Sequence, residues 1–504
     1  MLICFSVSPF KKDSKEKSAS NTIFLLLIIL HMEKALRSFL LTLLLLLFHY
    51  VMPSSAMTRT NVSTDQLTLL SLKSQISSDP FHYLDDSWSP ATYVCHWVGV
   101  TCDYRHQRVK SLNLSNMILT GTIPRDFGNL TFLVSLDLGS NNFHGNLPQE
   151  MAHLCQLKFL DLSLNKFSGE VPSWFGFLKQ LQVLKLRFNS FTGSIPPSLS
   201  NASKLETLEI SANLLVGNIP EEIGNLQNLN MLSMEHNQLT GSIPFTIFNI
   251  SSIQVIAFSN NSVSGKLPND LCNRLPILKE LHLSMNKLHG HMPISLSNCS
   301  QLQILSLSIN DFDGPIHSEI GRLSNLQILY LGSNHFTGII PQEIGNLVNL
   351  VELAVDVNQI TGSIPISIFN ISSLQFVSLR GNNLKGSLPR EIGNLTKIQV
   401  LFLNNNRFTG EIPKEIRNLV ELEELALGFN SFSGSLPMEI FNISGMRAMA
   451  LSFNNLSGTI PPNIGSVLPN IEELYMSNLT NLVGTVPHSI SNCSKLTILE
   501  LSEI

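Results

Sequence analysis

The sequence is poor in charged residues. Only 14% of its 504 residues are Asp, Glu, Lys or Arg, whereas an average soluble domain has about 25%. The 32 basic and 37 acidic residues give a formal net charge of −5, so no basic excess is available to neutralise the phosphates of a nucleic acid. An apolar share of 43% excludes a wholly disordered chain, because disorder goes with low hydrophobicity and high net charge.

Long apolar runs are confined to the start of the chain. The longer run, residues 39–51, has 13 residues, fewer than the roughly 20 that cross a bilayer as a helix. It follows a basic segment that begins at Met32 and precedes small residues that end at Ala56, which is typical of a secretory signal. We interpret residues 1–56 as a leader with its true start at Met32; a retained signal anchor is the alternative. No later stretch reaches 18 apolar residues, so we expect an extracytoplasmic mature chain without a transmembrane helix.

One short phrase, G-x-I/L-P, recurs throughout the remaining sequence. It begins at Gly121 and returns at intervals of 24 residues, except for 25 into Gly290 and 26 into Gly484. Such a strict period predicts a solenoid, in which each unit buries its apolar face against its neighbours. We place about 16 full repeats and a partial seventeenth in residues 110–504.

Each unit follows the pattern L-x-x-L-x-L-x-x-N-x-L/F-x-G. Leu184 and Leu186 alternate with Lys185 and Arg187, as expected for a short strand with one buried face. We expect these strands to be parallel to one another. The Asn slot predicts a ladder of amide side chains that satisfies backbone groups, and the L/F slot predicts a stacked aromatic spine.

These motifs resemble the plant-specific class of leucine-rich repeat. Residues 64–103 resemble the N-terminal cap of plant leucine-rich-repeat receptor kinases and receptor-like proteins, with Trp88 and the run from Cys95 to Cys102 (CHWVGVTC). The repeated EIGNL and IFNIS phrases most resemble the subfamily that includes the flagellin receptor. The resemblance implies an α/β fold: a right-handed leucine-rich-repeat superhelix with a parallel sheet on its concave face. We place its N-terminal cap at residues 57–109.

Family members continue into a membrane helix and a cytoplasmic Ser/Thr kinase. This chain stops at Ile504 within a repeat, and it contains no glycine-rich nucleotide loop, H-R-D or D-F-G motif. We therefore interpret it as an ectodomain truncated before the membrane helix and kinase, with no enzymatic activity. The scattered histidines have no metal-ligand or catalytic-triad spacing, so we expect neither a metal nor a cofactor.

The cysteines suggest one disulfide. Cys95 and Cys102 lie in the cap of a chain bound for an oxidising compartment, so we expect them to be bonded; a zinc site would need a second ligand pair. Cys299 and Cys493 occupy a slot that Ala202 fills in another unit. We expect these two to be free, small, buried apolar residues.

Thirteen N-x-S/T sequons predict a glycosylated surface. Many of them lie just before a strand, so the glycans would decorate one lateral face. The predicted sites are Asn61, Asn113, Asn129, Asn201, Asn249, Asn260, Asn298, Asn370, Asn394, Asn442, Asn455, Asn478 and Asn492.

Ligand specificity must come from the strand positions that face solvent, because the Leu, Asn and Phe slots are structural. Parallel strands about 4.8 Å apart would arrange these positions into a nearly continuous concave surface suited to an extended peptide. The candidate ligand-binding residues are Lys185, Arg187, Glu235, His282, Tyr330, Asp356, Arg380 and Phe402.

Two groups of candidates stand out. Lys185 and Arg187 are expected to face Glu209 and Glu235 in the following units, where simple cross-strand ion pairing is the alternative. Tyr330, Arg380 and Phe402 combine aromatic and cationic groups, which are common at interface hot spots. Scattered exposed residues without a shared role are the alternative for this second group.

The leading functional prediction is a non-catalytic extracellular sensor from a plant immune or developmental receptor. It would bind a peptide or protein ligand and pair with a co-receptor that also has leucine-rich repeats. We expect it in the secretory pathway and then on the extracellular side of the plasma membrane as part of a full receptor, or otherwise in the apoplast. The alternative is a secreted inhibitor that resembles the polygalacturonase inhibitors, which are shorter and end in a cysteine-containing cap.

Overall fold

The computed structural model describes residues 61–479 and 481–503, so the predicted leader and its cleavage site lie outside the described residues. The described part forms one compact unit that begins at Asn61. Asn61 and Thr64 start its first helix with a capping box, in which each side chain bonds the other's backbone N–H. The cap consists of α2 (Val62–Ser74), β1 (Ile76–Ser78), α3 (Tyr83–Ser87), the 3-10 helix η1 (Val94–His96) and β2 (Val100–Cys102).

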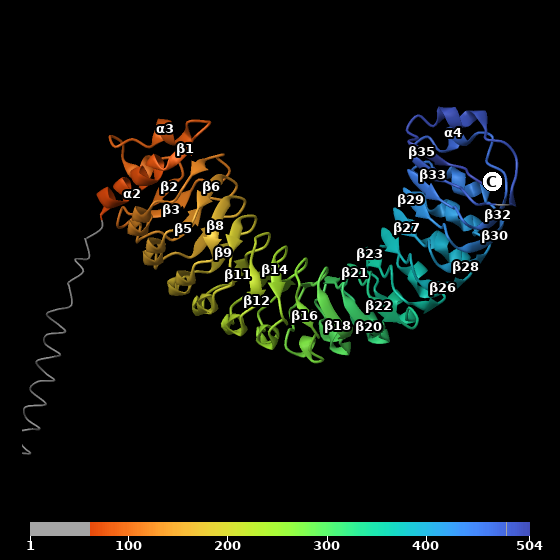
Figure 1. Cartoon of the computed structure of the whole chain (residues 1–504), viewed down its shortest axis with the longest axis horizontal. Coiled ribbons are helices and arrows are strands. Elements are labelled where there is room, and N and C mark those ends of the chain that lie inside the picture. Colours follow the sequence, from red (N-terminus) through yellow and green to blue (C-terminus); the bar gives the residue numbers. More distant parts are fainter. Residues whose placement is uncertain (1–60, 480, 504) are drawn as a thin grey trace, which may run out of the picture. The chain divides into compact units, whose positions relative to one another are not determined.

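One strand from each repeat joins a long sheet, which lines the inner side of the curved stack of repeats (Figure 1). β2 pairs antiparallel with the first of these strands, and all the others pair in parallel with the next in sequence. The strands are β3 (Val109–Asn113), β5 (Ser135–Asp137), β7 (Phe159–Asp161), β9 (Val183–Lys185), β11 (Thr207–Glu209), β13 (Met231–Ser233), β15 (Val255–Ala257), β17 (Glu280–His282), β19 (Ile304–Ser306), β21 (Ile328–Tyr330), β23 (Glu352–Ala354), β25 (Phe376–Ser378), β27 (Val400–Phe402), β29 (Glu424–Ala426), β31 (Ala448–Ala450), β33 (Glu473–Tyr475) and β35 (Ile498–Glu500).

A second set of shorter strands follows the Asn slot of each repeat. They are β4 (Thr120–Gly121), β6 (Asn142–Gly145), β8 (Lys166–Glu170), β10 (Ser190–Thr192), β12 (Val216–Asn218), β14 (Gln238–Thr240), β16 (Ser264–Gly265), β18 (Lys287–His291), β20 (Asp311–Pro315), β22 (His335–Thr337), β24 (Thr361–Gly362), β26 (Asn383–Gly386), β28 (Arg407–Gly410), β30 (Ser431–Ser435), β32 (Asn455–Gly458) and β34 (Asn481–Leu482). These strands form several small sheets rather than one continuous sheet.

Each repeat then makes a single short helical turn before it returns to the long sheet. The turns are η2 (Arg125–Asn129), η3 (Gln149–His153), η4 (Ser173–Phe177), η5 (Pro197–Asn201), η6 (Glu221–Asn225), η7 (Phe245–Asn249), η8 (Leu271–Asn273), η9 (Ile294–Asn298), η10 (Ser318–Arg322), η11 (Gln342–Asn346), η12 (Ile366–Asn370), η13 (Arg390–Asn394), η14 (Lys414–Asn418), η15 (Met438–Asn442), the α-helix α4 (Ile464–Val467) and η16 (His488–Asn492). The architecture confirms the predicted solenoid with a parallel sheet.

The register of the long sheet places equal slots of neighbouring repeats side by side. Leu208 pairs with Leu184 on one side and with Leu232 on the other. All three leucines are fully buried, so the centre of each strand belongs to the core. The residues that flank them consequently form continuous rows along the solvent-facing side of the sheet.

The Asn slot forms the predicted ladder between repeats. The Nδ2 of Asn189 donates to the carbonyl oxygens of Leu162 at 2.9 Å and Leu186 at 3.0 Å. Its Oδ1 accepts from the backbone N–H of Phe167 at 3.0 Å. Each such asparagine therefore satisfies backbone groups in its own repeat and in the preceding one.

The aromatic slot forms stacked pairs in the core. The rings of Phe143 and Phe167 lie 6.1 Å apart, and those of Phe167 and Phe191 lie 6.5 Å apart, in stacked arrangements. All three rings are fully buried. The predicted spine is thus part of the core and is not a binding site.

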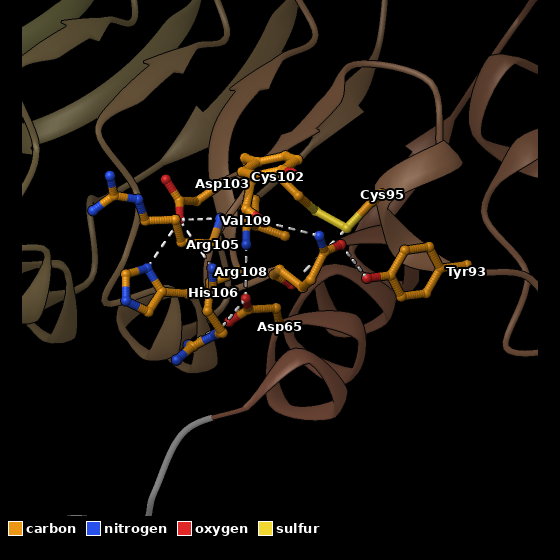
Figure 2. The surroundings of a disulfide bond; sticks show 11 residues. Asp65, Tyr93, Cys95, Cys102, Asp103, Arg105, His106, Arg108 and Val109 are labelled. Carbon is orange, nitrogen blue, oxygen red and sulfur yellow. Dashed lines mark hydrogen bonds and ion pairs between the residues drawn. A yellow bond between two sulfur atoms is a disulfide. The ribbon is translucent and has the colours of Figure 1, made fainter.

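The cap contains the predicted disulfide between Cys95 and Cys102, whose Cα atoms lie 5.5 Å apart (Figure 2). The prediction for Cys299 was wrong, because it is bonded to Cys272. Cys272 lies in η8, which has only three residues, and its Cα atom is 5.1 Å from that of Cys299 in the neighbouring repeat. Cys493 is free and buried, as predicted.

Candidate ligand-binding face

The solvent-facing side of strands β3 to β35 is the candidate ligand-binding face, which we call the concave face. In β21, for example, the central Leu329 is buried while Ile328 and Tyr330 remain partly exposed. The first side chain of a strand and the residues just after it face solvent in the same way along the sheet. In several strands, including β23 and β25, the third residue is small and buried.

Ion pairs already engage the basic candidates near the N-terminal end of the concave face. The guanidinium of Arg187 lies 3.3 Å from the carboxylate of Glu209, as expected for pairing with the following unit. Lys185 does not follow the prediction, because its ammonium lies 3.9 Å from Asp161 of the preceding strand. Glu235 forms no ion pair with any residue that the structure describes; its backbone N–H donates to Ser211. The structure therefore divides this predicted group into two separate pairs.

His282 lies at the end of β17 and is half-buried. Its Nε2 is 3.0 Å from the carboxylate of Glu280, which belongs to the same strand and the same face. Alternate residues of a strand share a face, and this spacing brings the two side chains together. The candidate is thus held by a neighbour from its own repeat.

Tyr330 and Phe402 lie in one row in the middle of the concave face, with two residues of that row between them. The register runs from Tyr330 through Ala354 and Ser378 to Phe402. Both intervening residues are small and buried. Three strand spacings of about 4.8 Å separate the two aromatic residues by roughly 14 Å. The row between them, which we call the floor, has only the small side chains of Ala354 and Ser378.

The polar candidates of this region are close to the same floor. Arg380 follows β25, and its guanidinium lies 3.6 Å from the carboxylate of Asp356. The Tyr330 hydroxyl donates to Glu352, and the ring of Phe402 meets Phe376 edge to face at 6.2 Å. The structure thus brings Tyr330, Arg380 and Phe402 into one region, as the sequence predicted.

Phe429 and Phe453, which the sequence places among the solvent-facing positions, form a further aromatic pair outside the eight candidate residues. Phe429 and Phe453 stack with their ring centroids 4.2 Å apart, although they are 52% and 44% exposed. Each residue precedes the ladder asparagine of its repeat, a slot with positive φ in both cases. Phe429 and Phe453 occupy the same slot in consecutive repeats. Because equal slots become neighbours in the stack, the sequence indicates that these two rings lie side by side.

The predicted glycan sites leave most of the concave face open. Eight of the sequon asparagines are the last residue of a 3-10 helix, so they form a row away from the long sheet. Asn113, at the end of β3, is an exception on the long sheet itself. The eight are Asn129, Asn201, Asn249, Asn298, Asn370, Asn394, Asn442 and Asn492.

The described part of the chain contains neither a group of residues that could form a metal centre nor a helix that could span a membrane. Within residues 61–479 and 481–503, no three His, Cys, Asp or Glu side chains are grouped so that they could hold a metal ion. In the same residues, no helix has the length and apolar character needed to cross a bilayer.

Comparison with known proteins identifies both the cap and the repeats. A leucine-rich-repeat N-terminal domain model matches residues 62–103, and the leucine-rich-repeat model matches five consecutive units between residues 108 and 226. A leucine-rich-repeat region model matches residues 284–504. The solved structure of the plant peptide hormone receptor RGFR1 in complex with RGF2 has 33% identity and a TM-score of 0.63, and the match covers 77% of this chain and 70% of that one. The chain belongs to the leucine-rich-repeat family of plant receptor ectodomains.

Other relatives of this leucine-rich-repeat receptor ectodomain match over shorter stretches. The LRR receptor-like serine/threonine-protein kinase EFR of Arabidopsis thaliana is 42% identical over 87 residues, which are 17% of this chain and 8% of that kinase. A polygalacturonase inhibitor of Vitis vinifera is 36% identical over 72 residues, which are 14% of this chain and 21% of the inhibitor. The chain thus aligns with only a small part of the length of these relatives.

Proposed function

We propose that this chain is the non-catalytic, ligand-sensing part of a plant receptor for immune or developmental signals. Its concave face binds a peptide or another protein. The observation that carries this proposal is the open floor between Tyr330 and Phe402, with the guanidinium of Arg380 beside it. The solved relative in complex with RGF2 supports a ligand of the peptide class.

The geometry suits an extended ligand that runs along the sheet. The small side chains of Ala354 and Ser378 allow the backbone of a ligand to approach closely, while the two flanking aromatic rings offer apolar surface. Arg380 is half-exposed and only 3.6 Å from Asp356, so a ligand carboxylate can compete for it. Exposed ion pairs of this kind contribute only about 0–1 kcal/mol to stability. Arg380 can therefore exchange Asp356 for a ligand carboxylate at a small cost in free energy.

The proposal includes the setting in which the chain acts. The chain enters the secretory pathway, acts on the extracellular side of the plasma membrane as part of a full receptor, and pairs with a co-receptor that has leucine-rich repeats. The similarity to a plant receptor-like kinase and to a plant peptide hormone receptor supports this setting.

A capture experiment tests the proposal. The secreted chain is immobilised, incubated with the peptide fraction of plant extracellular fluid, and the retained peptides are identified by mass spectrometry. We expect at least one peptide to be retained by the unmodified chain and lost from Tyr330→Ala, Arg380→Ala or Phe402→Ala. Phe177→Ala is the control, because Phe177 is 63% exposed in η4, away from the long sheet. Retention that is unaffected by all three variants, or losses that follow reduced secretion, would contradict the proposal.

A second candidate function is inhibition of an extracellular enzyme, which the match to a polygalacturonase inhibitor favours. A polygalacturonase activity assay with the purified chain separates the two functions. A receptor ectodomain leaves the pectin-cleaving activity unchanged, whereas an inhibitor lowers it in proportion to the amount of chain added.

A further inference from the structure

A small hollow on the concave face lies six to eight repeats from Tyr330, toward the cap. Its volume is about 190 Å³, room for several water molecules at about 30 Å³ each or for the end of one long side chain. The residues that line it include Asp137, Gly139, Asp161, Ser163, Lys185 and Arg187.

Two carboxylates share this hollow. The Oδ1 of Asp137 accepts from the backbone N–H of Gly139 at 3.0 Å, and the Oδ1 of Asp161 accepts from the backbone N–H of Ser163 at 2.9 Å. Gly139 has no side chain to separate them: a Cβ there would lie 3.2 Å from Asp137 Oδ1 and 3.4 Å from Asp161 Oδ1. Among the described residues, the second oxygen of Asp137 forms no ion pair, whereas that of Asp161 faces the ammonium of Lys185 at 3.9 Å.

The wall of the hollow contains an unsatisfied hydroxyl group. Ser163 is only 5% exposed, and its Oγ has no hydrogen-bond partner among the residues that the structure describes. In other repeats the equivalent serine bonds a serine of the next strand: Ser211 pairs with Ser233 at 2.6 Å. The residue in that position for Ser163 is Lys185, so the usual partner is missing. Buried polar groups nearly always find a partner, so this oxygen is free for a ligand.

The charges of the hollow favour a cation over an anion. Arg187 is drawn toward Glu209, at 3.3 Å, and Lys185 lies 3.9 Å from Asp161. Asp137 forms no ion pair within the described residues. Burial raises the pKa of the Asp137 carboxyl above its ordinary value, and the neighbouring Asp161 adds to the rise. Both basic side chains thus have an acidic partner, whereas Asp137 has no ion pair and feels Lys185 only as a charge at longer range, which lowers its pKa less than burial raises it.

We infer that this hollow binds a cationic side chain of the ligand, either a guanidinium or an ammonium group, through Asp137, Asp161 and the hydroxyl of Ser163. The inference rests on the proposed function, because it assigns one subsite of the same concave face. The bound cation would bridge the two carboxylates and replace Lys185 as the partner of Asp161. This replacement is easy, because an ion pair at 3.9 Å on a partly exposed surface is weak.

The test compares two short peptides by saturation-transfer nuclear magnetic resonance with the secreted full chain. One is acetyl-Gly-Gly-Arg-Gly-Gly-amide, and the other carries citrulline, the neutral isostere of arginine, at the central position. We expect the arginine peptide to bind about fivefold more tightly, because a charge-assisted hydrogen bond is roughly twice as strong as the neutral one that citrulline can make. Asp137→Asn should abolish the preference. Asp356→Asn is the matched control, because Asp356 lies on the same face but is paired with Arg380.

A gain-of-binding variant excludes misfolding as the explanation. Lys185→Ala removes the competing ammonium and leaves the Ser163 hydroxyl without the serine partner that Ser211 has in Ser233. Both carboxylates then become free while the hydroxyl stays available, so we expect the arginine peptide to bind about twofold to fivefold more tightly. Equal binding of the two peptides, absence of any binding, or an unchanged preference in Asp137→Asn would overturn the inference. None of these results decides whether Tyr330 and Phe402 contact a ligand. The capture experiment with variants of those two residues tests the proposed function separately.

Discussion

Asp65 and Arg108 are 43 residues apart in the sequence and form a buried, two-pronged ion pair that ties the cap helix to the first repeat. The guanidinium donates to both carboxylate oxygens, at 2.8 Å and 2.7 Å. The backbone N–H of Val109, the first residue of β3, donates to the same carboxylate at 2.9 Å. Figure 2 shows Asp65 reaching from α2 toward both residues. This pair aligns the cap with the edge of the long sheet.

Loss of one member of this pair should strongly destabilise the cap. Arg108→Met leaves the carboxylate of Asp65, which is fully buried, without its cation, and such a change typically costs about 3 to 5 kcal/mol. Urea unfolding monitored by tryptophan fluorescence checks this, because Trp88 and Trp97 stack within the cap. Arg390→Met is the control, since the side chain of Arg390 is 80% exposed. Equal unfolding midpoints for both variants would contradict the expected role.

A ladder asparagine should matter far more than an exposed one. Asn358 donates to three carbonyl oxygens, at 3.0, 3.1 and 3.0 Å, and accepts from the backbone N–H of Phe336 at 2.9 Å. Asn358→Ala leaves these buried groups without partners, and we expect a loss of about 2 to 4 kcal/mol in the free energy of unfolding. Asn349→Ala removes one bond at an exposed site and should change stability little. Chemical unfolding of the two variants makes the comparison, and similar losses would argue against the ladder.

The 24-residue period accounts for what could be predicted from the sequence. Leucine, asparagine and phenylalanine slots recur, and the in-register stacking of repeats turns each slot into a row, so the ladder, the spine and the region of Tyr330 and Phe402 followed directly. The Asp65–Arg108 pair joins two segments that do not repeat, so no period points to it. The partner of Lys185 depends on side-chain direction, which the spacing of charges along the sequence does not determine.

The Cys272–Cys299 disulfide was missed because its two cysteines occupy different slots. Cys272 lies within the shortened η8, whereas Cys299 directly follows η9. The bond spans 27 residues, which predicts about 3 to 4 kcal/mol of stabilisation from loop closure. The double variant Cys272→Ala/Cys299→Ala should lose stability by about this amount, as measured by chemical unfolding under non-reducing conditions. Cys155→Ala, at an exposed free cysteine, is the control; peptide mapping that finds Cys299 unpaired would disprove the disulfide.

The stability of the chain should depend on pH through the protonation of Asp137. Burial, followed by repulsion from Asp161, raises the pKa of this carboxyl above its ordinary value of 3.8. The folded state therefore favours the protonated acid, so this group's contribution to stability is greatest below pH 3.8 and declines as the pH rises through the raised pKa. Asp137→Asn cannot ionise, so it should be more stable than the unmodified chain at pH 7. The advantage should disappear near pH 3.5 in thermal unfolding; a variant less stable at pH 7 would contradict the expected sign.

The central claim is that the concave face between β21 and β27 contacts the ligand, and site-specific photo-crosslinking tests it most directly. The photoreactive analogue p-benzoylphenylalanine replaces Tyr330 in one variant and Phe177, in η4, in another. After incubation with the peptide fraction of plant extracellular fluid, illumination should attach a peptide at position 330 and none at position 177. Crosslinks at position 177 without any at position 330 would contradict the claim.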